Sequence, residues 1–411
     1  MSNNIIKVSR NTVNAPKTSV STQTVAFSHY NNISAQLPIN PNTGKIVTGG
    51  IKEQTKQCLE NIKAIVESID HVMDDTVKIN IFLKNISDTA EVDEVYTTFF
   101  KSYLPTRMMV AISALPLEGA LIQIDALISN GEGTAPQAPC ALVKVARNTE
   151  KAPKGLSSHT VAFSHYNNLS AQLPINPITN ELVDGGIEEQ TQQCLQNIHA
   201  ILDSIGHDMN DIVKTTVCLK NLADVDAVNK AFTTFFPNYV PARTIINASA
   251  LPHDALIQID TVVSHGDGTP PQLPEDTSLL VIEANNAQDA PQVPYSHTVA
   301  FSHYNHIAGQ LPINPTTNEI VTGDVKSQTK QCLNNIKAII ESVEHVIDDT
   351  VKVNIQLKNI ADINAVNEVY TKFFNGTLPA QTVIGVSDIP MNALVQIDAV
   401  VSNCEGTPPQ T

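Results

Sequence analysis

Three similar segments of the chain differ at one position that could take part in chemistry. They read PTRMMVAISALP from residue 105, PARTIINASALP from residue 241 and PAQTVIGVSDIP from residue 379, so the third position holds Arg107, Arg243 or Gln381. A guanidinium group can pair with a local acidic side chain, or its planar fork can bind the carboxylate of a ligand through two hydrogen bonds. A glutamine has no charge with which to do either. The three segments are therefore not chemically equivalent.

Other residue types that often bind metals do not have the spacing of a metal site. The histidines of the SHYN and SHTVAFSHY segments have no acidic or cysteine partner at ligand spacing, and we expect them to be structural or exposed (His29, His159, His165, His297 and His303). The six cysteines form no CxxC pair, which favours reduced, buried thiols. The acidic segment NISDTAEVDEVY lacks the pattern of a calcium loop. We expect no metal ion.

The composition limits the partners of the chain. Its formal net charge is −16 and it has no run of lysine and arginine, so we do not expect it to bind nucleic acid. Its apolar stretches are shorter than the roughly 18 residues of a membrane span, and its first residues lack the apolar core of a secretory signal. We expect a cytoplasmic protein. The sequence has no glycine-rich phosphate loop and no lysine in a Schiff-base setting, so we expect no cofactor.

The chain consists of three copies of one unit. VAFSHYNNISAQLPINP from residue 25 returns as VAFSHYNNLSAQLPINP from residue 161 and VAFSHYNHIAGQLPINP from residue 299. Each copy ends in a glycine- and proline-rich segment, which is typical of a linker. Such a long period indicates tandem globular domains, because solenoid repeats are usually about 20 to 50 residues long. We predict repeats at 1–137, 138–274 and 275–411.

The elements within one repeat indicate an α+β unit. The segment before QLPINP is apolar and β-branched and reads as a hairpin of two strands, and IKEQTKQCLENIKAIVESI has the period of an amphipathic helix. A strand over TVKINIFLKNI, a helix over DTAEVDEVYTTFF and strands over RMMVAISAL and ALIQIDALIS follow. The order ββαβαββ predicts a sheet with two helices on one face. Its other face needs a partner, so we expect the three sheets to pack around a pseudo-threefold axis.

The same segments resemble a known family. SAQLPINPNTGKIVTGGIKEQTKQCLENIKAIVES, followed by DDTVKINIFLKNI, VYTTFF, PTR and ALIQIDAL, is similar to the RidA/YjgF family of reactive-intermediate (enamine/imine) deaminases, also known as L-PSP endoribonucleases. The resemblance covers nearly all of each repeat. It implies a chorismate-mutase-like fold, which in this family forms homotrimers with ligand pockets between subunits. It therefore implies one pseudo-trimeric chain, a monomer that replaces the homotrimer, with small-carboxylate pockets between its repeats.

The resemblance also assigns residues that bind substrate. It implies that Arg107 and Arg243 hold the substrate carboxylate, and that Gln381 cannot. The family's Ser-Gly-Gln turn corresponds to Ser34-Ala35, Ser170-Ala171 and Ala308-Gly309, and its binding tyrosine corresponds to Ser21, Ser157 and Tyr295. A helix asparagine of the family matches Asn229 and Asn367, with Asp93 in the first repeat. Because family pockets are shared between neighbours, we expect Tyr295 and Gly309 to face an arginine of the first or second repeat.

The last strand of each repeat departs from the family. Active members have a glutamate there that positions or activates the hydrolytic water, and this chain has Gln123, Gln258 and Gln396. A glutamine can orient water but cannot take up its proton, and loss of a general base typically slows a reaction about 10²- to 10⁴-fold. The resemblance thus implies a weak deaminase that hydrolyses 2-imino acids to 2-oxo acids and ammonia. A non-catalytic carboxylate-binding or scaffold protein and an endoribonuclease are the alternatives.

Overall fold

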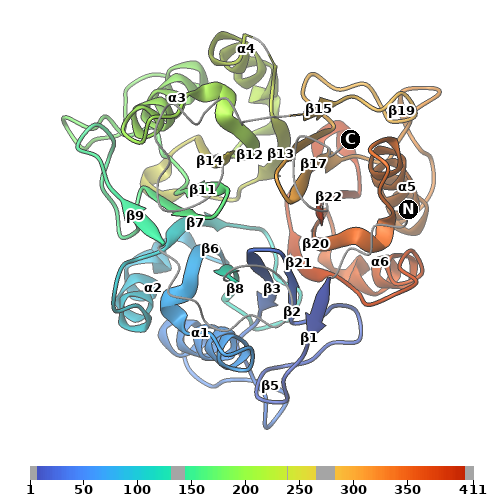
Figure 1. The fold of residues 1–411 in the computed structure, drawn as a ribbon, viewed down its shortest axis with the longest axis horizontal. Helices are drawn as coiled ribbons and strands as arrows, with labels where there is room; N and C mark the ends of the chain where they lie inside the picture. Colours follow the sequence, from blue (N-terminus) through green and yellow to red (C-terminus); the bar gives the residue numbers. More distant parts are fainter. Residues whose placement is uncertain (1–6, 131–143, 238, 265–282, 403–411) are drawn as a thin grey trace.

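The structure, a computed structural model, describes residues 7–130, 144–237, 239–264 and 283–402. Three six-stranded sheets, one in each repeat, lie around a common centre, with the helices on the outside (Figure 1). The predicted repeat boundaries near residues 137 and 274 lie outside the described residues. The α+β class predicted from the order of elements is confirmed.

The first repeat contains two helices, α1 (Ile51–Glu67) and α2 (Thr89–Tyr96). Its strands are β1 (Val8–Arg10), β2 (Thr24–Phe27), β3 (Tyr30–Gln36), β4 (Ile39–Asn40), β5 (Lys45–Ile46), β6 (Thr76–Leu83), β7 (Thr106–Ala111) and β8 (Ile122–Ser129).

The other two repeats contain the corresponding elements. The second has helices α3 (Ile187–Asp203) and α4 (Val225–Phe235) and strands β9 (Val145–Arg147), β10 (Thr160–Phe163), β11 (Tyr166–Leu169), β12 (Ile212–Leu219), β13 (Ala242–Asn247) and β14 (Ile257–Ser264). The third has helices α5 (Val325–Ser342) and α6 (Ile363–Tyr370) and strands β15 (Glu283–Asn285), β16 (Thr298–Phe301), β17 (Tyr304–Gln310), β18 (Ile313–Asn314), β19 (Glu319–Ile320), β20 (Thr350–Leu357), β21 (Ala380–Gly385) and β22 (Val395–Ser402).

The strand order in the first sheet is β1-β2-β3-β8-β6-β7, and the other two sheets repeat it. The neighbours β6 and β7 are parallel, while the remaining pairs are antiparallel. The edge strands β1, β9 and β15 were not predicted. Each has only three residues, which is too short to show the alternation by which a strand is recognised. The opposite edge of each sheet is the strand that carries the arginine or its replacement. These strands are β7 with Arg107, β13 with Arg243 and β21 with Gln381.

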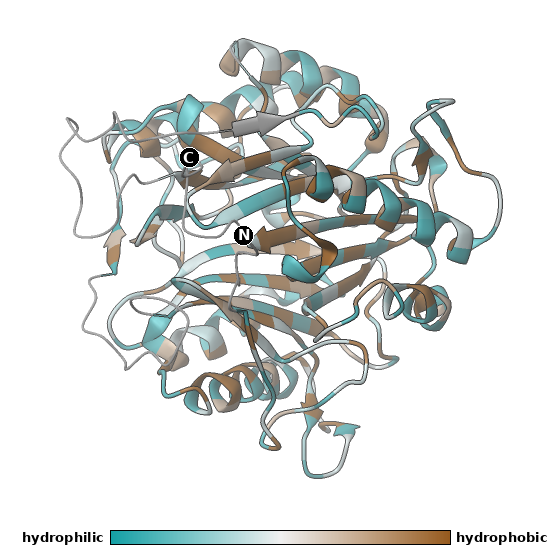
Figure 2. Cartoon of the chain, turned by 45° about the vertical axis from the view of Figure 1, so that its right-hand side comes forward, coloured by the Kyte–Doolittle hydropathy of each residue, from teal (hydrophilic) through white to brown (hydrophobic). Residues whose placement is uncertain are grey.

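The long helix of each repeat covers one face of its sheet. In α1 the buried positions follow the predicted helical period, and the helix packs against the side chains on one face of β8 (Ile122, Ile124, Ala126 and Ile128). Figure 2 shows this pattern as brown segments along the strands and as alternating teal and brown along the helices. At the start of the helix the Gly50 backbone nitrogen donates to Glu53 Oε2 at 2.8 Å, which is one of the two hydrogen bonds of a capping box.

The opposite faces of the three sheets meet one another. One buried cluster combines Phe82 and Met108 of the first repeat with Ile246 of the second and Ile384 of the third, and another combines equivalent residues of all three hairpins. The sheet face that the sequence analysis left without a partner is therefore buried against the other repeats. Burial of apolar surface stabilises this contact by roughly 25 cal/mol per Å².

The structure bears on the predicted state of the cysteines and on membrane-spanning helices. The described cysteines, which are Cys58, Cys194, Cys218 and Cys332, are free and buried, as predicted, and Cys140 and Cys404 lie outside the described residues. Across the described segments, no helix is both long enough and apolar enough to cross a bilayer.

Candidate functional site

Each strand that carries the arginine or its replacement lies against the segment of the next repeat that corresponds to the family's Ser-Gly-Gln turn, which is Ser170-Ala171, Ala308-Gly309 or Ser34-Ala35. The Arg107 backbone nitrogen donates to Ser170 Oγ at 2.9 Å, and Ala171 donates to the Arg107 carbonyl at 3.0 Å. The Gln381 backbone nitrogen donates to Ser34 Oγ at 2.8 Å in the same way. The sequence-predicted residues therefore come together between repeats: first with second, second with third, and third with first.

Between the second and third repeats, the arginine is enclosed on both sides. The Arg243 guanidinium carbon lies 5.2 Å from the ring centroid of Phe232 and 4.9 Å from that of Tyr295, which the third repeat supplies. Its Nη2 donates to Asn229 Oδ1 at 2.5 Å, and its Nε has no hydrogen-bond partner in the part of the chain that the structure describes. This placement brings Arg243, Asn229 and Tyr295 into one site.

Arg243 is also buried without an acidic partner. The residue is 2% exposed, and none of the described aspartates and glutamates forms an ion pair with it. Burial lowers the pKa of its guanidinium, against a smaller opposing effect of Tyr295. A guanidinium group stays protonated even so, and a buried charge without a counter-ion is costly. A bound anion would supply the missing charge.

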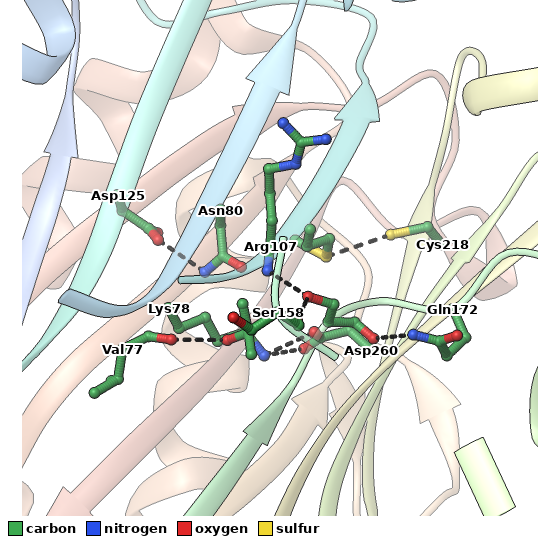
Figure 3. Close-up of polar contacts among 12 residues, drawn as sticks. Val77, Lys78, Asn80, Arg107, Asp125, Ser158, Gln172, Cys218 and Asp260 are labelled. Carbon is green, nitrogen blue, oxygen red and sulfur yellow. Dashed lines mark hydrogen bonds and ion pairs between the residues drawn. The ribbon is translucent and has the colours of Figure 1, made fainter. Parts of the chain in front are cut away.

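Between the first and second repeats, the arginine already has its anion. Arg107 Nη1 forms an ion pair with Asp93, and the two side chains are only 13% and 17% exposed. Tyr96 lies under the guanidinium, with 5.1 Å from its ring centroid to the guanidinium carbon, and Ser157 stands where the third repeat has Tyr295. In Figure 3 the Arg107 side chain points away from the contact between Lys78 and Asp260. Of the two alternatives for these arginines, Arg107 pairs with a local acid and Arg243 does not.

Between the third and first repeats, a neutral amide, that of Gln381, replaces the arginine. Gln381 is buried, and its Nε2 has no partner. The Oδ1 atom of Asn367, at the position of Asn229, also has none. The Gln381 amide thus has an unsatisfied donor and the Asn367 amide an unsatisfied acceptor. A water molecule or an uncharged group of a ligand could form hydrogen bonds with both.

Gly309 allows a close approach at the site that contains Arg243. A Cβ atom added to Gly309 would lie 2.6 Å from Gln396 Nε2 and 3.3 Å from the methyl group of Thr244, which follows Arg243. The first two repeats have Ala35 and Ala171 at this position. The glycine therefore lets the Gln396 amide rest against the backbone beside the arginine strand of the neighbouring repeat.

The three glutamines of the last strands have a common environment. All are buried, and the Oε1 atom of each lacks a hydrogen-bond partner in the structure (Gln123, Gln258 and Gln396). An unpaired amide oxygen can accept a hydrogen bond from a water molecule or from an amino group of a ligand, but it cannot accept its proton. The interface that contains Arg243 therefore combines a buried cation of the second repeat with a hydrogen-bond acceptor, Gln396 Oε1, of the third.

Sequence reasoning missed a second group of polar residues at the centre of the molecule. Lys78 Nζ bonds both carboxylate oxygens of Asp260, at 2.6 and 2.7 Å, and the pairs Lys214–Asp398 and Lys352–Asp125 are equivalent. They line a cavity of about 150 Å³ to which all three repeats contribute. A signal was present, because each repeat has one charged residue, a lysine, in a strand that otherwise holds only apolar and uncharged polar residues (Lys78, Lys214 and Lys352).

The central cavity shifts the pKa values of groups that line it. Burial lowers the pKa of Lys214 and of Lys352, against the opposing effect of the paired carboxylates. His306 also lines the cavity, and the first and second repeats have Asn32 and Asn168 in its place. Burial, together with the positive charges of neighbouring lysines, lowers the pKa of His306 to about 3. This histidine is therefore neutral at physiological pH, and its Nε2 atom has no partner.

Comparison with known families identifies the repeat. The family model described as endoribonuclease L-PSP matches three times, at residues 13–129, 149–265 and 286–403. These three matches together account for most of the chain.

Individual relatives each correspond to one repeat. A RutC family protein of Pyrococcus horikoshii is 42% identical over 120 residues, which are 29% of this chain and 94% of the relative. A 2-iminobutanoate/2-iminopropanoate deaminase of Dermatophagoides farinae is 39% identical over 27% of this chain and 89% of its own length. Among solved structures, Escherichia coli TdcF with bound serine is 28% identical and covers 29% of this chain and 98% of its own, with a TM-score of 0.29.

Proposed function

The chain belongs to the endoribonuclease L-PSP family, and we propose that it is a slow 2-imino acid deaminase with one competent pocket, at the interface of its second and third repeats. The reaction adds water across the C=N bond of a 2-imino acid and releases a 2-oxo acid and ammonia. Relatives named 2-iminobutanoate/2-iminopropanoate deaminase, of Dermatophagoides farinae and Mus musculus, support the substrate class.

The observation that carries the proposal is the environment of Arg243. Its guanidinium is buried between two aromatic rings and has an amide partner but no acidic one among the described residues. A small carboxylate would restore neutrality in a site of low polarity, where charge-assisted hydrogen bonds are strong. Arg107 is already neutralised by Asp93, and Gln381 carries no charge. The three equivalent sites are therefore expected to differ in affinity, with the highest affinity at Arg243.

The rate is expected to be low because glutamine stands where active family members have the glutamate that activates water. Gln396, beside Gly309, can accept a hydrogen bond from the attacking water but cannot remove its proton. Positioning of the substrate next to this water is the contribution that remains. The same observation favours a second candidate, a carboxylate-binding protein without catalysis, which shares the pocket and lacks only the turnover.

Cleavage of RNA is a weaker alternative in spite of the family's description. A net charge of −16 repels a polyanion, and affinity for nucleic acid depends mostly on contacts between cationic side chains and phosphates. The one buried guanidinium of the proposed pocket lies between two rings, which suits a small carboxylate better than a polymer.

Ammonia release from 2-iminobutanoate, formed in place by threonine dehydratase, tests the proposal. Parent protein is compared with Arg243→Gln and Arg107→Gln, and binding of 2-oxobutanoate is measured by calorimetry in parallel. Glutamine is the matched substitution because the chain itself has Gln381 at this position. Loss of a charged hydrogen bond of about 1.5 to 3 kcal/mol predicts about a 10- to 150-fold weaker binding in Arg243→Gln. Arg107→Gln is expected to match the parent.

The outcomes separate the candidates. Acceleration that disappears in Arg243→Gln alone supports the deaminase. Binding that is lost in Arg243→Gln, with no acceleration in the parent, identifies the carboxylate-binding protein. An effect of Arg107→Gln with none of Arg243→Gln would place the working pocket at the other interface and contradict the proposal.

A further inference from the structure

Three histidines from the three repeats meet at one point. His29, His165 and His303 each occupy the second place of a two-residue turn that closes the first hairpin of their repeat, between the paired residues Phe27 and Tyr30 in the first repeat and their equivalents in the others. The serine before each histidine has a φ of about 50°, in the left-handed region. The same turn, made three times, presents the three imidazoles in the same way.

The three rings form a nearly regular triangle. Their centroids are 5.2, 5.1 and 5.1 Å apart, and their planes are inclined to one another by 58 to 61°. One ring nitrogen from each histidine lies within 4.8 Å of the other two. All three side chains are partly exposed. The cluster therefore lies where an ion from solution can reach it.

The layer next to the histidines holds the three turns in register. Tyr30, Tyr166 and Tyr304 follow them in the sequence, and their rings are 6.0 to 6.2 Å apart. Each hydroxyl donates a hydrogen bond to the carbonyl of the phenylalanine that begins the turn of another repeat. The position of each turn is thus tied to a neighbouring repeat, which preorganises the histidine triangle.

We propose that His29, His165 and His303 together bind one divalent transition-metal ion of the zinc, cobalt or nickel class. A zinc ion bound by three imidazoles at about 2.0 to 2.1 Å in tetrahedral geometry keeps the ring centroids about 5.2 Å apart. The observed separations already match this value, so binding requires the rings to rotate and not the turns to move. The exposed side of the triangle leaves the fourth position to water.

The chemistry of the cluster selects the class of ion. The group of possible ligands contains imidazoles alone, without a carboxylate. Imidazole suits zinc, nickel and copper, whereas calcium and magnesium need oxygen ligands. Spacing along the chain gave no sign of a metal site, because these histidines are 136 and 138 residues apart. The fold, not the spacing, makes them neighbours.

A comparison of the repeats supports a shared role for the histidines. The repeats have diverged at the positions of Arg107 and Tyr295, yet all three keep histidine in the turn. The geometry of a two-residue turn does not itself require histidine. A site that takes one ligand from each repeat accounts for its presence in all three. It uses none of the residues of the proposed deaminase pocket, so either site can exist without the other.

Calorimetric titration of ZnCl₂ into the full chain, without a histidine tag and stripped with a chelator, tests the proposal. We expect one ion per chain, and we expect Co²⁺ to give the visible absorption of a four-coordinate ion. His303→Asn removes one ligand and is expected to weaken binding at least about tenfold. His199→Asn, on the exposed face of α3, is the matched control and should bind as the parent does. Arg243→Gln should also leave the affinity unchanged.

A second measurement does not depend on any variant. The anomalous signal of a zinc-soaked crystal should contain a peak between the three imidazoles. No saturable binding up to millimolar zinc, equal binding by His303→Asn and the parent, or a zinc peak elsewhere without one between the rings would each overturn the proposal.

Discussion

The guanidinium of Arg243 lies against the ring of Tyr295, which belongs to the next repeat, with 4.9 Å from the guanidinium carbon to the ring centroid. The equivalent interface of the first and second repeats combines Arg107 with Ser157, which has no ring to offer. A cation over an aromatic face gains about 0.5 to 2 kcal/mol, more when both groups are shielded from water. Divergence at two positions thus makes one interface of the three suited to an unpaired cation.

Replacement of Tyr295 by serine, the residue of the other two repeats, tests this relationship. Tyr295→Ser removes one wall of the pocket and lets water reach Arg243, so a carboxylate should bind about 2- to 30-fold more weakly. Titration with 2-oxobutanoate measures the effect. Tyr370→Phe is a suitable control because the second repeat has Phe232 at that position. Unchanged affinity in Tyr295→Ser would show that the ring does not contribute to the pocket.

The ion pair of Asp93 with Arg107 predicts a gain of binding. Asp93→Asn gives the first repeat the asparagine that the second has as Asn229, and it leaves Arg107 without an acidic partner. A second carboxylate should then bind per chain, so the stoichiometry for 2-oxobutanoate should rise from one to two. Asp88→Asn, at the residue just before α2, is a control on a nearby half-buried acid. A stoichiometry that stays at one would show that Asp93 is not what closes the first site.

The sequence predicted the fold of one repeat because the relevant signals are local. The period of α1 and the alternation of β8 each fall within one short segment, and both are found where the pattern places them. The edge strand β1 was missed because three residues show no period. The pairing of Lys78 with Asp260 could not be predicted, because these residues are 182 positions apart and belong to different repeats.

The candidate site could be predicted in part. The differences at Arg243 and Tyr295 were visible in an alignment of the repeats, and so was the possibility that they meet. Which repeat supplies the arginine depends on the order of the repeats around the centre, which only the fold determines. The sequence also could not distinguish a paired arginine from an unpaired one, since that depends on the distance between Asp93 and Arg107.

Restoring a carboxylate beside the working pocket should increase the rate. Gln396→Glu provides a general base next to Gly309, and such a base typically accelerates a reaction about 10²- to 10⁴-fold. Release of ammonia from 2-iminobutanoate measures the change. Gln123→Glu is the matched control, because the first repeat meets Gln381 of the third and its site has no arginine. Equal acceleration in both variants would show that the pocket with Arg243 has no special role.

The buried histidine of the central cavity predicts a dependence of stability on pH. His306 has a pKa of about 3 in the folded chain and about 6.5 when unfolded. Between these values the unfolded chain binds one more proton than the folded chain, so the free energy of unfolding rises with pH. The stability is fully present above about pH 6.5 and is lost as the pH falls toward 3, with a slope of about 1.4 kcal/mol per pH unit.

His306→Asn should remove this dependence, because asparagine does not titrate and the other repeats have Asn32 and Asn168 at this position. Urea unfolding at pH 7 and pH 5 measures it: between these values the parent should lose about 2 kcal/mol more stability than the variant. His253→Asn, at an exposed turn, should behave as the parent does. Equal losses of stability in His306→Asn and the parent would contradict this prediction. They would mean that His306 takes up a proton as easily in the folded chain as in the unfolded chain. The effect of burying His306 is thus measured as the difference between the parent and His306→Asn in the free energy of unfolding that each loses from pH 7 to pH 5.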